Sequence, residues 1–165
     1  MNKVVTDKEV TFDENTLLVT KTDTKGKITY ANRAFIDIVK MKESELIDKP
    51  HSIVRHPDMP KVIFKLLWNY LKDGKEINAY VKNLCSDGSY YWVFANVTPS
   101  YFNNKVVGYH SARRKPTKKA LDFIIPLYKE LLAIEKSSGV EASFKKVMQI
   151  LDEKGVRYDE FILSI

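Results

Sequence analysis

The sequence predicts an α+β fold: a five-stranded antiparallel sheet with its helices gathered on one face, followed by a C-terminal helical tail. Several short segments carry apolar residues at every second position and are separated by turn signals, of which Asp87-Gly88 is the strongest. After Pro116 the apolar residues recur at helical spacing instead. The order of elements is two strands, short helices, one long helix and a three-strand meander. This order is typical of an antiparallel sheet with segregated helices.

The chain is predicted to begin its sheet with a hairpin. Leu17 to Thr22 form the first strand and Lys27 to Ala31 the second, joined by a tight turn at Thr24 to Gly26. Residues 34–39 have the spacing of a short helix, and Asn32 is placed to cap it because Asn is a favoured N-cap residue.

A long helix is predicted from Pro60 to about Lys72. Its apolar residues form one broad face, and Gly74 follows its end. Before it, one further helical turn is expected over Glu43 to Ile47, and Lys49-Pro50 ends that turn. The segment from His51 to Met59 has no regular period and is dense in polar side chains.

Three consecutive strands complete the predicted sheet. They run over Glu76 to Cys85, Tyr90 to Tyr101 and Lys105 to Arg114. Asp87-Gly88 and Asn103-Asn104 supply the two hairpin turns. On the middle strand the odd-numbered and even-numbered side chains face opposite sides of the sheet, because side chains alternate along a strand.

The tail is predicted to hold two amphipathic helices. Pro126 lies within the first as a kink or a restart, and Ser138 to Glu141 form a capping box that opens the second. We divide the chain into an N-terminal cap (1–14), a central domain (15–115) and the helical tail (116–165). The two apolar stripes of the tail either fold back on the sheet or each other, or dock on a second copy or another protein.

The composition excludes several classes of protein. With 44% apolar residues in a chain of 165, the sequence can bury a core. No apolar run approaches the roughly 18–20 residues that a membrane span needs, so no direct membrane insertion is expected. The chain start lacks the apolar stretch of a signal peptide. A single cysteine, Cys85, favours a reducing, cytoplasmic environment.

The net charge of +6 arises from residues 1–115, because the rest of the chain has eight basic and eight acidic residues. This surplus favours an anionic ligand only weakly. The densest basic cluster spans Arg113 to Lys119 and has no interleaved aromatic residues, so no nucleic-acid partner is expected. The sequence contains no Walker loop, no GxGxxG motif and no metal-ligand spacing, and no nucleophile–base pair indicates an enzyme.

One segment carries the chemistry of an anion or heterocycle site: residues 55–60, directly before the long helix. Arg55 offers a planar set of donors, and His56 can donate or accept. The helix N-terminus that follows would add amide groups and the positive end of a dipole. The alternative is structural, with Asp58 capping the helix and Pro60 filling its first turn.

Residues 55–60 and several other stretches of the sequence resemble the flavin-binding PAS module of Aer-type aerotaxis and energy-taxis sensors. The most specific match is the run from Val54 to Val62, and the resemblance covers about residues 10–130. Further matching strings are Ile28-Thr29-Tyr30-Ala31-Asn32, Val81-Lys82-Asn83 and Asp87-Gly88-Ser89-Tyr90-Tyr91-Trp92-Val93. The resemblance implies a PAS fold, a non-covalently bound FAD and the sensing of redox state through that flavin.

The resemblance also implies which residues matter for the flavin. The family's motif residues correspond here to Arg55, His56, Asp58 and Asn32, and Asn83 is a further polar candidate. Ile77 stands where the family often has a tryptophan. Packing against the flavin ring is therefore expected from Trp68 or Trp92, although Trp68 also fits a core position.

The family's receptors continue into a membrane anchor and a methyl-accepting domain, which this sequence lacks. It is similar in this respect to stand-alone CetB-type proteins of bipartite energy-taxis systems. The implied partner is a membrane-bound methyl-accepting chemotaxis transducer, with a homodimer as a further possibility. Two alternatives stay open: a haem-binding PAS domain with His51, His56 or His110 as axial ligand, and a ligand-free adaptor.

Overall fold

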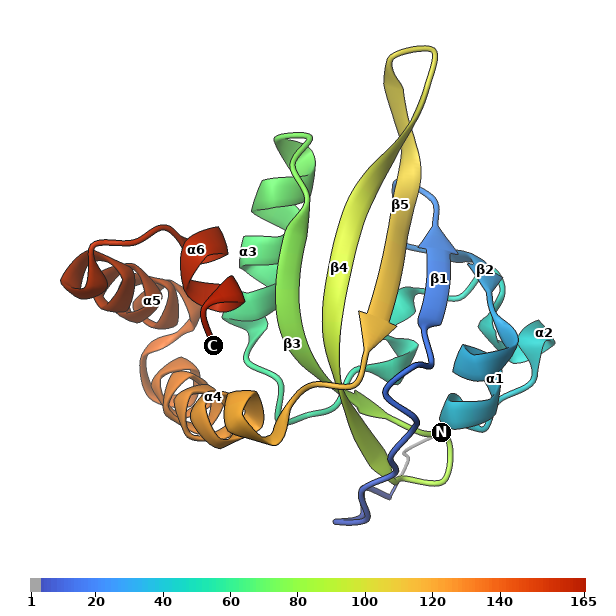
Figure 1. Ribbon diagram of the computed structural model, residues 1–165, viewed down its shortest axis with the longest axis horizontal. Coiled ribbons are helices and arrows are strands. Elements are labelled where there is room, and N and C mark those ends of the chain that lie inside the picture. Colours follow the sequence, from blue (N-terminus) through green and yellow to red (C-terminus); the bar gives the residue numbers. More distant parts are fainter. Residues whose placement is uncertain (1–3) are drawn as a thin grey trace.

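The computed structural model describes residues 4–165 and contains the predicted five-stranded antiparallel sheet, with strand order β2-β1-β5-β4-β3 (Figure 1). Residues 1–3 of the expected N-terminal cap lie outside the described part of the chain. The α+β prediction is confirmed. The strands are β1 (Leu18–Thr22), β2 (Ile28–Ala31), β3 (Ile77–Leu84), β4 (Tyr90–Phe102) and β5 (Lys105–Arg114).

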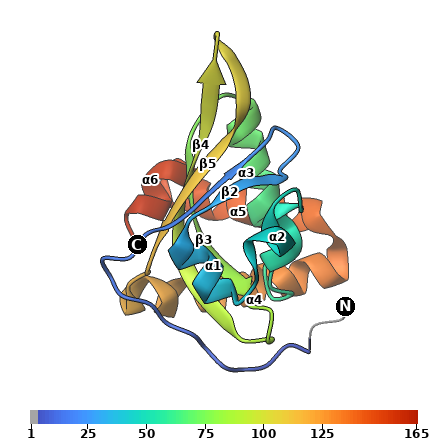
Figure 2. The same cartoon turned by 90° about the vertical axis from the view of Figure 1, so that its right-hand side faces the viewer.

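Four helical elements, three short and one longer, connect β2 to β3 (Figure 2). They are α1 (Arg33–Val39), α2 (Glu43–Leu46), the 3₁₀ helix η1 (His51–Val54) and α3 (Lys61–Lys72). The segment that the sequence left irregular therefore contains one turn of 3₁₀ helix. As predicted, the Asn32 side chain caps α1 by accepting from the Phe35 backbone N–H at 3.0 Å.

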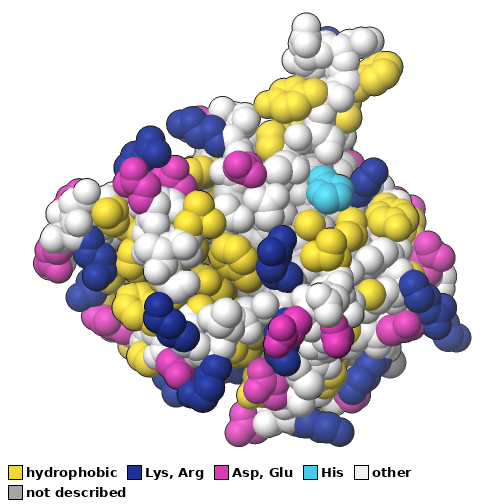
Figure 3. Space-filling model, viewed as in Figure 1, with side chains coloured by type: hydrophobic (Ala, Val, Ile, Leu, Met, Phe, Trp, Pro, Cys, Tyr) yellow, Lys and Arg dark blue, Asp and Glu magenta, His cyan; other side chains and the backbone are white. Residues whose placement is uncertain are grey.

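The β4–β5 hairpin projects beyond the rest of the sheet. Pairing with β3 ends at Val97 and pairing with β1 ends at Tyr109, so residues 100–108 pair only with each other (Figure 1). Asn103 and Asn104 both adopt positive φ angles, as a tight hairpin turn requires. Exposed apolar side chains gather on this projection (Figure 3).

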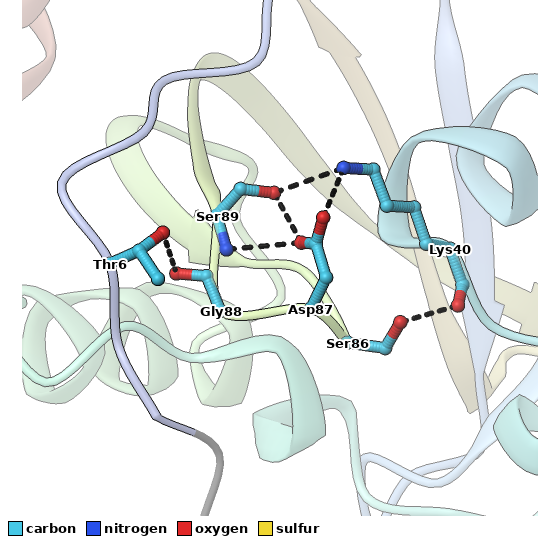
Figure 4. A network of polar contacts seen from close by, with 6 residues as sticks. All are labelled: Thr6, Lys40, Ser86, Asp87, Gly88 and Ser89. Carbon is cyan, nitrogen blue, oxygen red and sulfur yellow. Dashed lines mark hydrogen bonds and ion pairs between the residues drawn. The ribbon is translucent and has the colours of Figure 1, made fainter.

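The β3–β4 turn is tied to two distant segments (Figure 4). Lys40, at the end of α1, donates to Asp87 at 2.5 Å and to the Ser89 hydroxyl at 3.2 Å. The hydrogen bond from Lys40, together with those from the Ser89 hydroxyl and N–H, holds the pKa of the Asp87 carboxyl below its usual value. Thr6 donates to the Gly88 carbonyl through its N–H at 2.9 Å and through its hydroxyl. The N-terminal segment is therefore fastened along this turn.

The tail consists of α4 (Lys118–Ser138), α5 (Val140–Lys154) and α6 (Tyr158–Leu163). Pro126 lies inside α4 without ending it, so of the two expected outcomes the restart is wrong and the kink stays a prediction. The predicted capping box is also wrong: Ser138 is the last residue of α4, and Gly139, with a φ of 87°, precedes α5 without a side-chain cap. Helix α6 was not predicted from the sequence, because its six residues are too few for a helical period to be recognised.

The tail packs against the sheet beyond the edge strand β3 (Figures 1 and 2). The Tyr128 ring of α4 lies 6.0 Å from the Trp92 ring, and its hydroxyl donates to the Tyr80 carbonyl at 2.6 Å. The Tyr158 hydroxyl of α6 donates to the Asn78 carbonyl at 2.8 Å. Of the two expected arrangements, the structure therefore shows the tail folded back.

Replacing Asn32 by Ala should lower the free energy of unfolding by about 1–3 kcal/mol. The same amide oxygen that caps α1 also accepts from the Val19 N–H at 3.0 Å, and the amide nitrogen donates to the Leu17 carbonyl. Urea unfolding at pH 7 measures the change. Asn32→Asp keeps the oxygen that caps α1 but removes the donor to Leu17, so it should lose less than Asn32→Ala. Equal losses in both variants would contradict this role.

Candidate functional site

A cavity of about 250 Å³, partly open to solvent, lies between α3 and the inner face of the sheet. Its walls come from β1, β3, β4 and β5 on one side, and from α3, η1 and the β1–β2 turn on the other. The residues that line the cavity include Thr20, Lys25, His51, Arg55, Phe64, Leu67, Trp68, Leu71, Asn83, Ala95, Tyr109, Ser111 and Arg113.

The α3 wall of the cavity is apolar and aromatic. Phe64, Leu67, Trp68 and Leu71 follow one another at helical spacing, so they share one face of α3. Trp68 packs edge-on against Tyr109 of β5, with ring centroids 5.4 Å apart. The sheet opposite carries small side chains, including Ala95 and Ser111, which leave the space open. A flat ring system fits between two such walls.

Arg113 provides a buried positive charge on the sheet side of the cavity. Only 4% of this residue is exposed. Its Nη2 donates to the Thr20 hydroxyl at 2.9 Å and lies 2.6 Å from the His51 Nε2, while Nη1 has no partner in the described structure. Burial lowers the pKa of Arg113 to about 10, so the guanidinium is still charged at neutral pH. An unpartnered buried donor of this kind is suited to a ligand oxygen or nitrogen.

His51 accepts from this arginine and is therefore neutral. Burial, and then the charge of Arg113, lower the pKa of the imidazole to about 3. Because Nε2 faces a donor, the ring proton belongs on Nδ1. The Thr20 hydroxyl lies 3.1 Å from the same Nε2 and completes a compact polar group.

Arg55 lies at the cavity mouth. Its guanidinium stacks 3.8 Å from the centroid of the Phe64 ring, and Lys25 and Ser52 line the same opening. The Arg55 backbone forms an isolated bridge with Asn83 on β3. The mouth therefore combines an oriented guanidinium with a lysine, which suits an anionic group outside the apolar slot.

Most of the part of the chain that forms the cavity also matches a known family of domains. Residues 28–113 match the family described as the PAS fold, which is more than half of the sequence. The chain belongs to the PAS family.

The PAS domain is of the Aer type. It is 39% identical over 136 residues to the aerotaxis receptor of Escherichia coli (strain K12), which covers 82% of this chain and 27% of the receptor. The chain thus spans about a quarter of that relative's length. The expected family resemblance is confirmed at this level.

Solved structures agree in fold. The dark structure of the Aureochrome1 LOV photoreceptor matches with a TM-score of 0.59 and 18% identity, covering 66% of this chain and 82% of that one. A PAS domain from Colwellia psychrerythraea matches with a TM-score of 0.56 and 20% identity, covering 62% and 87%. At these identities the likeness concerns the fold alone.

The expected site residues fall into two groups, those that line the cavity and those that do not. Arg55, Asn83 and Trp68 line the cavity, and their contact with a cofactor stays a prediction. His56 and Asp58 do not line it. The loop that carries them wraps around the free edge of β3, so consecutive side chains fall on different sides of the sheet.

The loop residues fasten Arg55 in place instead. His56 is only 2% exposed, packs against Tyr90 and accepts from the Asp58 backbone N–H at 3.1 Å. The Asp58 carboxylate pairs with Lys82 at 2.8 Å, so the expectation that it caps the long helix is wrong: Pro60 holds the N-cap position. The Met59 sulfur accepts from the Lys82 backbone N–H.

Two further expected contacts lie away from the cavity. Asn32 is occupied in capping α1 and joining it to β1. Trp92 faces the opposite side of the sheet, where it packs against Tyr128. The amides at the start of α3 are not free for an anion either, because the Glu135 carboxylate accepts from the Lys61 and Val62 N–H groups.

The sequence did not predict that Arg113, His51 and Thr20 form one buried polar group on the side of the sheet that also carries Ser111. Arg113 was counted only as part of the densest basic cluster, although its position on the odd-numbered side of a predicted strand could have placed it beside Ser111. His110, weighed as a haem ligand, lies on the other side of β5.

Across residues 4–165, three or more metal-ligating side chains never gather, and none of the helices is long and apolar enough to span a bilayer.

The low pKa of His51 predicts acid sensitivity. The folded state takes up this proton only near pH 3, whereas the unfolded chain takes it up near pH 6.5, so stability should fall as pH is lowered through this window. The slope contributed is at most about 1.4 kcal/mol per pH unit. Urea unfolding between pH 7 and pH 4 measures it. His51→Gln should have a shallower slope, and identical slopes in both proteins would rule out this origin.

Proposed function

We propose that this PAS domain is a redox sensor that holds FAD in the cavity between α3 and the sheet. The observation that carries the proposal is the buried guanidinium of Arg113, a residue that lines this largely apolar cavity and whose Nη1 has no hydrogen-bond partner in the described structure. A flavin ring combines an apolar, flat body with a polar edge, and these two features match the two walls. The Aer-type relationship supports the same class of ligand.

The cavity volume supports an arrangement in which the flavin ring is bound inside the cavity and the rest of FAD is bound outside it. Sites that enclose a whole drug-sized ligand measure about 300–1,000 Å³, which exceeds the 250 Å³ of this cavity. The isoalloxazine ring would lie in the slot, and the pyrophosphate of FAD would lie at the mouth beside Arg55 and Lys25.

Haem is a poorer match. A porphyrin is wider than a flavin ring, and an axial histidine must have a nitrogen free for iron. His56 and His110 lie outside the cavity, and the Nε2 of His51 is engaged by Arg113 and Thr20. A ligand-free adaptor is also disfavoured, because side chains would then be expected to fill the cavity and satisfy Arg113.

The flavin would supply electron transfer, and this chain's residues would bind it and respond to its charge. Arg113 places a fixed positive charge at the polar edge of the slot, which favours added negative charge on the ligand. His51 and Thr20 are hydrogen-bonded to that guanidinium, so any shift of Arg113 toward the ligand alters both contacts. We assign no catalytic role to the protein.

We place this sensor in energy taxis, acting in the cytoplasm on a membrane-bound methyl-accepting chemotaxis transducer. The Aer-type relationship supports a role in chemotaxis signalling, and the transducer is the partner that this proposal names. A homodimer is compatible with the same role.

The full chain incubated with FAD, FMN or haem, and then freed of excess ligand, should retain FAD at one molecule per chain. Absorbance spectroscopy of the protein fraction identifies the ligand, and acid release followed by chromatography separates FAD from FMN. Retention of haem alone, or of no pigment, would overturn the flavin assignment.

Arg113→Met should weaken FAD binding by about ten- to a hundredfold, the loss of a hydrogen bond to a charged group. Flavin fluorescence titration gives the affinity. Met has a similar length and no charge, and the ligand-free variant should be at least as stable as the parent, because a buried unpaired charge is removed. Arg113→Lys retains the charge and should lose less. If Arg113→Met bound FAD as tightly as the parent, the guanidinium would not face the flavin.

A further inference from the structure

The start of α3 is capped by a side chain from the tail. The two carboxylate oxygens of Glu135 accept from the Lys61 N–H at 2.9 Å and from the Val62 N–H at 2.8 Å. More than 70 residues of sequence separate these groups. Neither Pro60 nor another residue of the preceding loop caps this helix through its side chain. A charged carboxylate at a helix N-terminus also interacts favourably with the helix dipole.

Glu135 reaches this position because it continues the buried stripe of α4. Ile124, Tyr128 and Leu131 face the domain, and Glu135 follows four residues later on the same side. Tyr128 is fixed against Trp92 and the Tyr80 carbonyl. One face of α4 therefore contacts the outer side of the sheet at one point and the start of α3 at another.

Helix α3 is shared between the cavity and the tail. One face carries Trp68 and the other apolar side chains of the cavity wall. Another face carries Lys65, which pairs with Glu141 and lies over the Phe144 ring of α5. Tyr70 packs against Tyr158 of α6, with ring centroids 5.9 Å apart. A displacement of α3 therefore changes cavity and tail contacts together.

We propose that Glu135 is a positioning residue for the cavity, acting through α3. Its carboxylate fixes the first turn of α3, so the docked state of the tail and the ligand-binding shape of the cavity are coupled. By linkage, a ligand that favours the docked position of α3 strengthens tail docking, and loss of the cap weakens ligand binding by the same factor. The ligand-binding half of this proposal rests on the proposed flavin function, whereas the docking half does not.

The first test uses the ligand-free full chain. In Glu135→Ala, hydrogen exchange at the start of α3 and along α4 and α5 should accelerate by about fivefold or more, which corresponds to the loss of a helix cap. Glu135→Gln keeps the shape and one accepting oxygen and should give a smaller change. The control is Glu130→Gln, which removes the exposed ion pair of α4 with Lys146 and should leave α3 unchanged. Unchanged exchange in Glu135→Ala would overturn the proposal.

A chemical rescue separates the cap from general damage to the tail. Acetate can occupy the vacated amides in Glu135→Ala, so acetate should slow exchange at the start of α3 relative to chloride at equal ionic strength. It should have no such effect on the parent or on Glu130→Gln. Exchange in Glu135→Ala that does not respond to acetate would contradict a role as an anionic cap.

The second test titrates FAD into the same variants. Affinity should fall about fivefold in Glu135→Ala, be partly restored by acetate and be unaffected in Glu130→Gln. If the parent itself bound no FAD, the proposed function would fail, while the exchange results would still judge the cap. If Glu135→Ala released the tail but bound FAD like the parent, the coupling would be wrong and the flavin function would stand.

Discussion

The outer edge of strand β3 has to be covered, and the arrangement of this protein depends on how it is covered. An uncovered edge strand presents unpaired backbone groups that can pair with another chain. Here the outward carbonyls of Asn78 and Tyr80 accept from tyrosine hydroxyls of the tail, and the N–H of Lys82 donates to Met59. Two segments that are distant in sequence cover this edge: the tail and the loop before α3. Each is thereby held in a fixed position against β3.

The loop before α3 shows what this covering achieves. Because residues 55–60 wrap around the β3 edge, Arg55 falls on the cavity side and His56 on the other. The ion pair of Asp58 with Lys82 and the burial of His56 then hold the loop in place. This loop, which contains the most specific part of the sequence resemblance, thus holds the Arg55 guanidinium beside Phe64 at the cavity. Arg113 completes the site from inside, where its burial is costly unless a ligand supplies an acceptor.

The sequence predicted what depends on local chemistry and missed what depends on contacts between distant segments. Turn signals such as Asp87-Gly88 located all five strands, because hairpin turns restrict backbone angles locally. Asp58 and Ser138 were both assigned as caps because of their residue type, yet one pairs with a strand and the other ends a helix. Arg113 was predicted on the correct strand, but its burial depends on His51 and Thr20, which only the folded sheet brings near.

The tail is part of the sensor's structure as well as a candidate output. Without it, Trp92 and the Tyr80 carbonyl would be exposed, and the start of α3 would lose its cap. A partner that captured the tail would therefore have to replace these contacts or leave a bare strand edge behind. The cost of that exposure keeps the tail docked in the absence of a competing surface. Signalling through the tail consequently requires either a partner that also covers β3, or a ligand state that moves α3 enough to weaken the Glu135 cap.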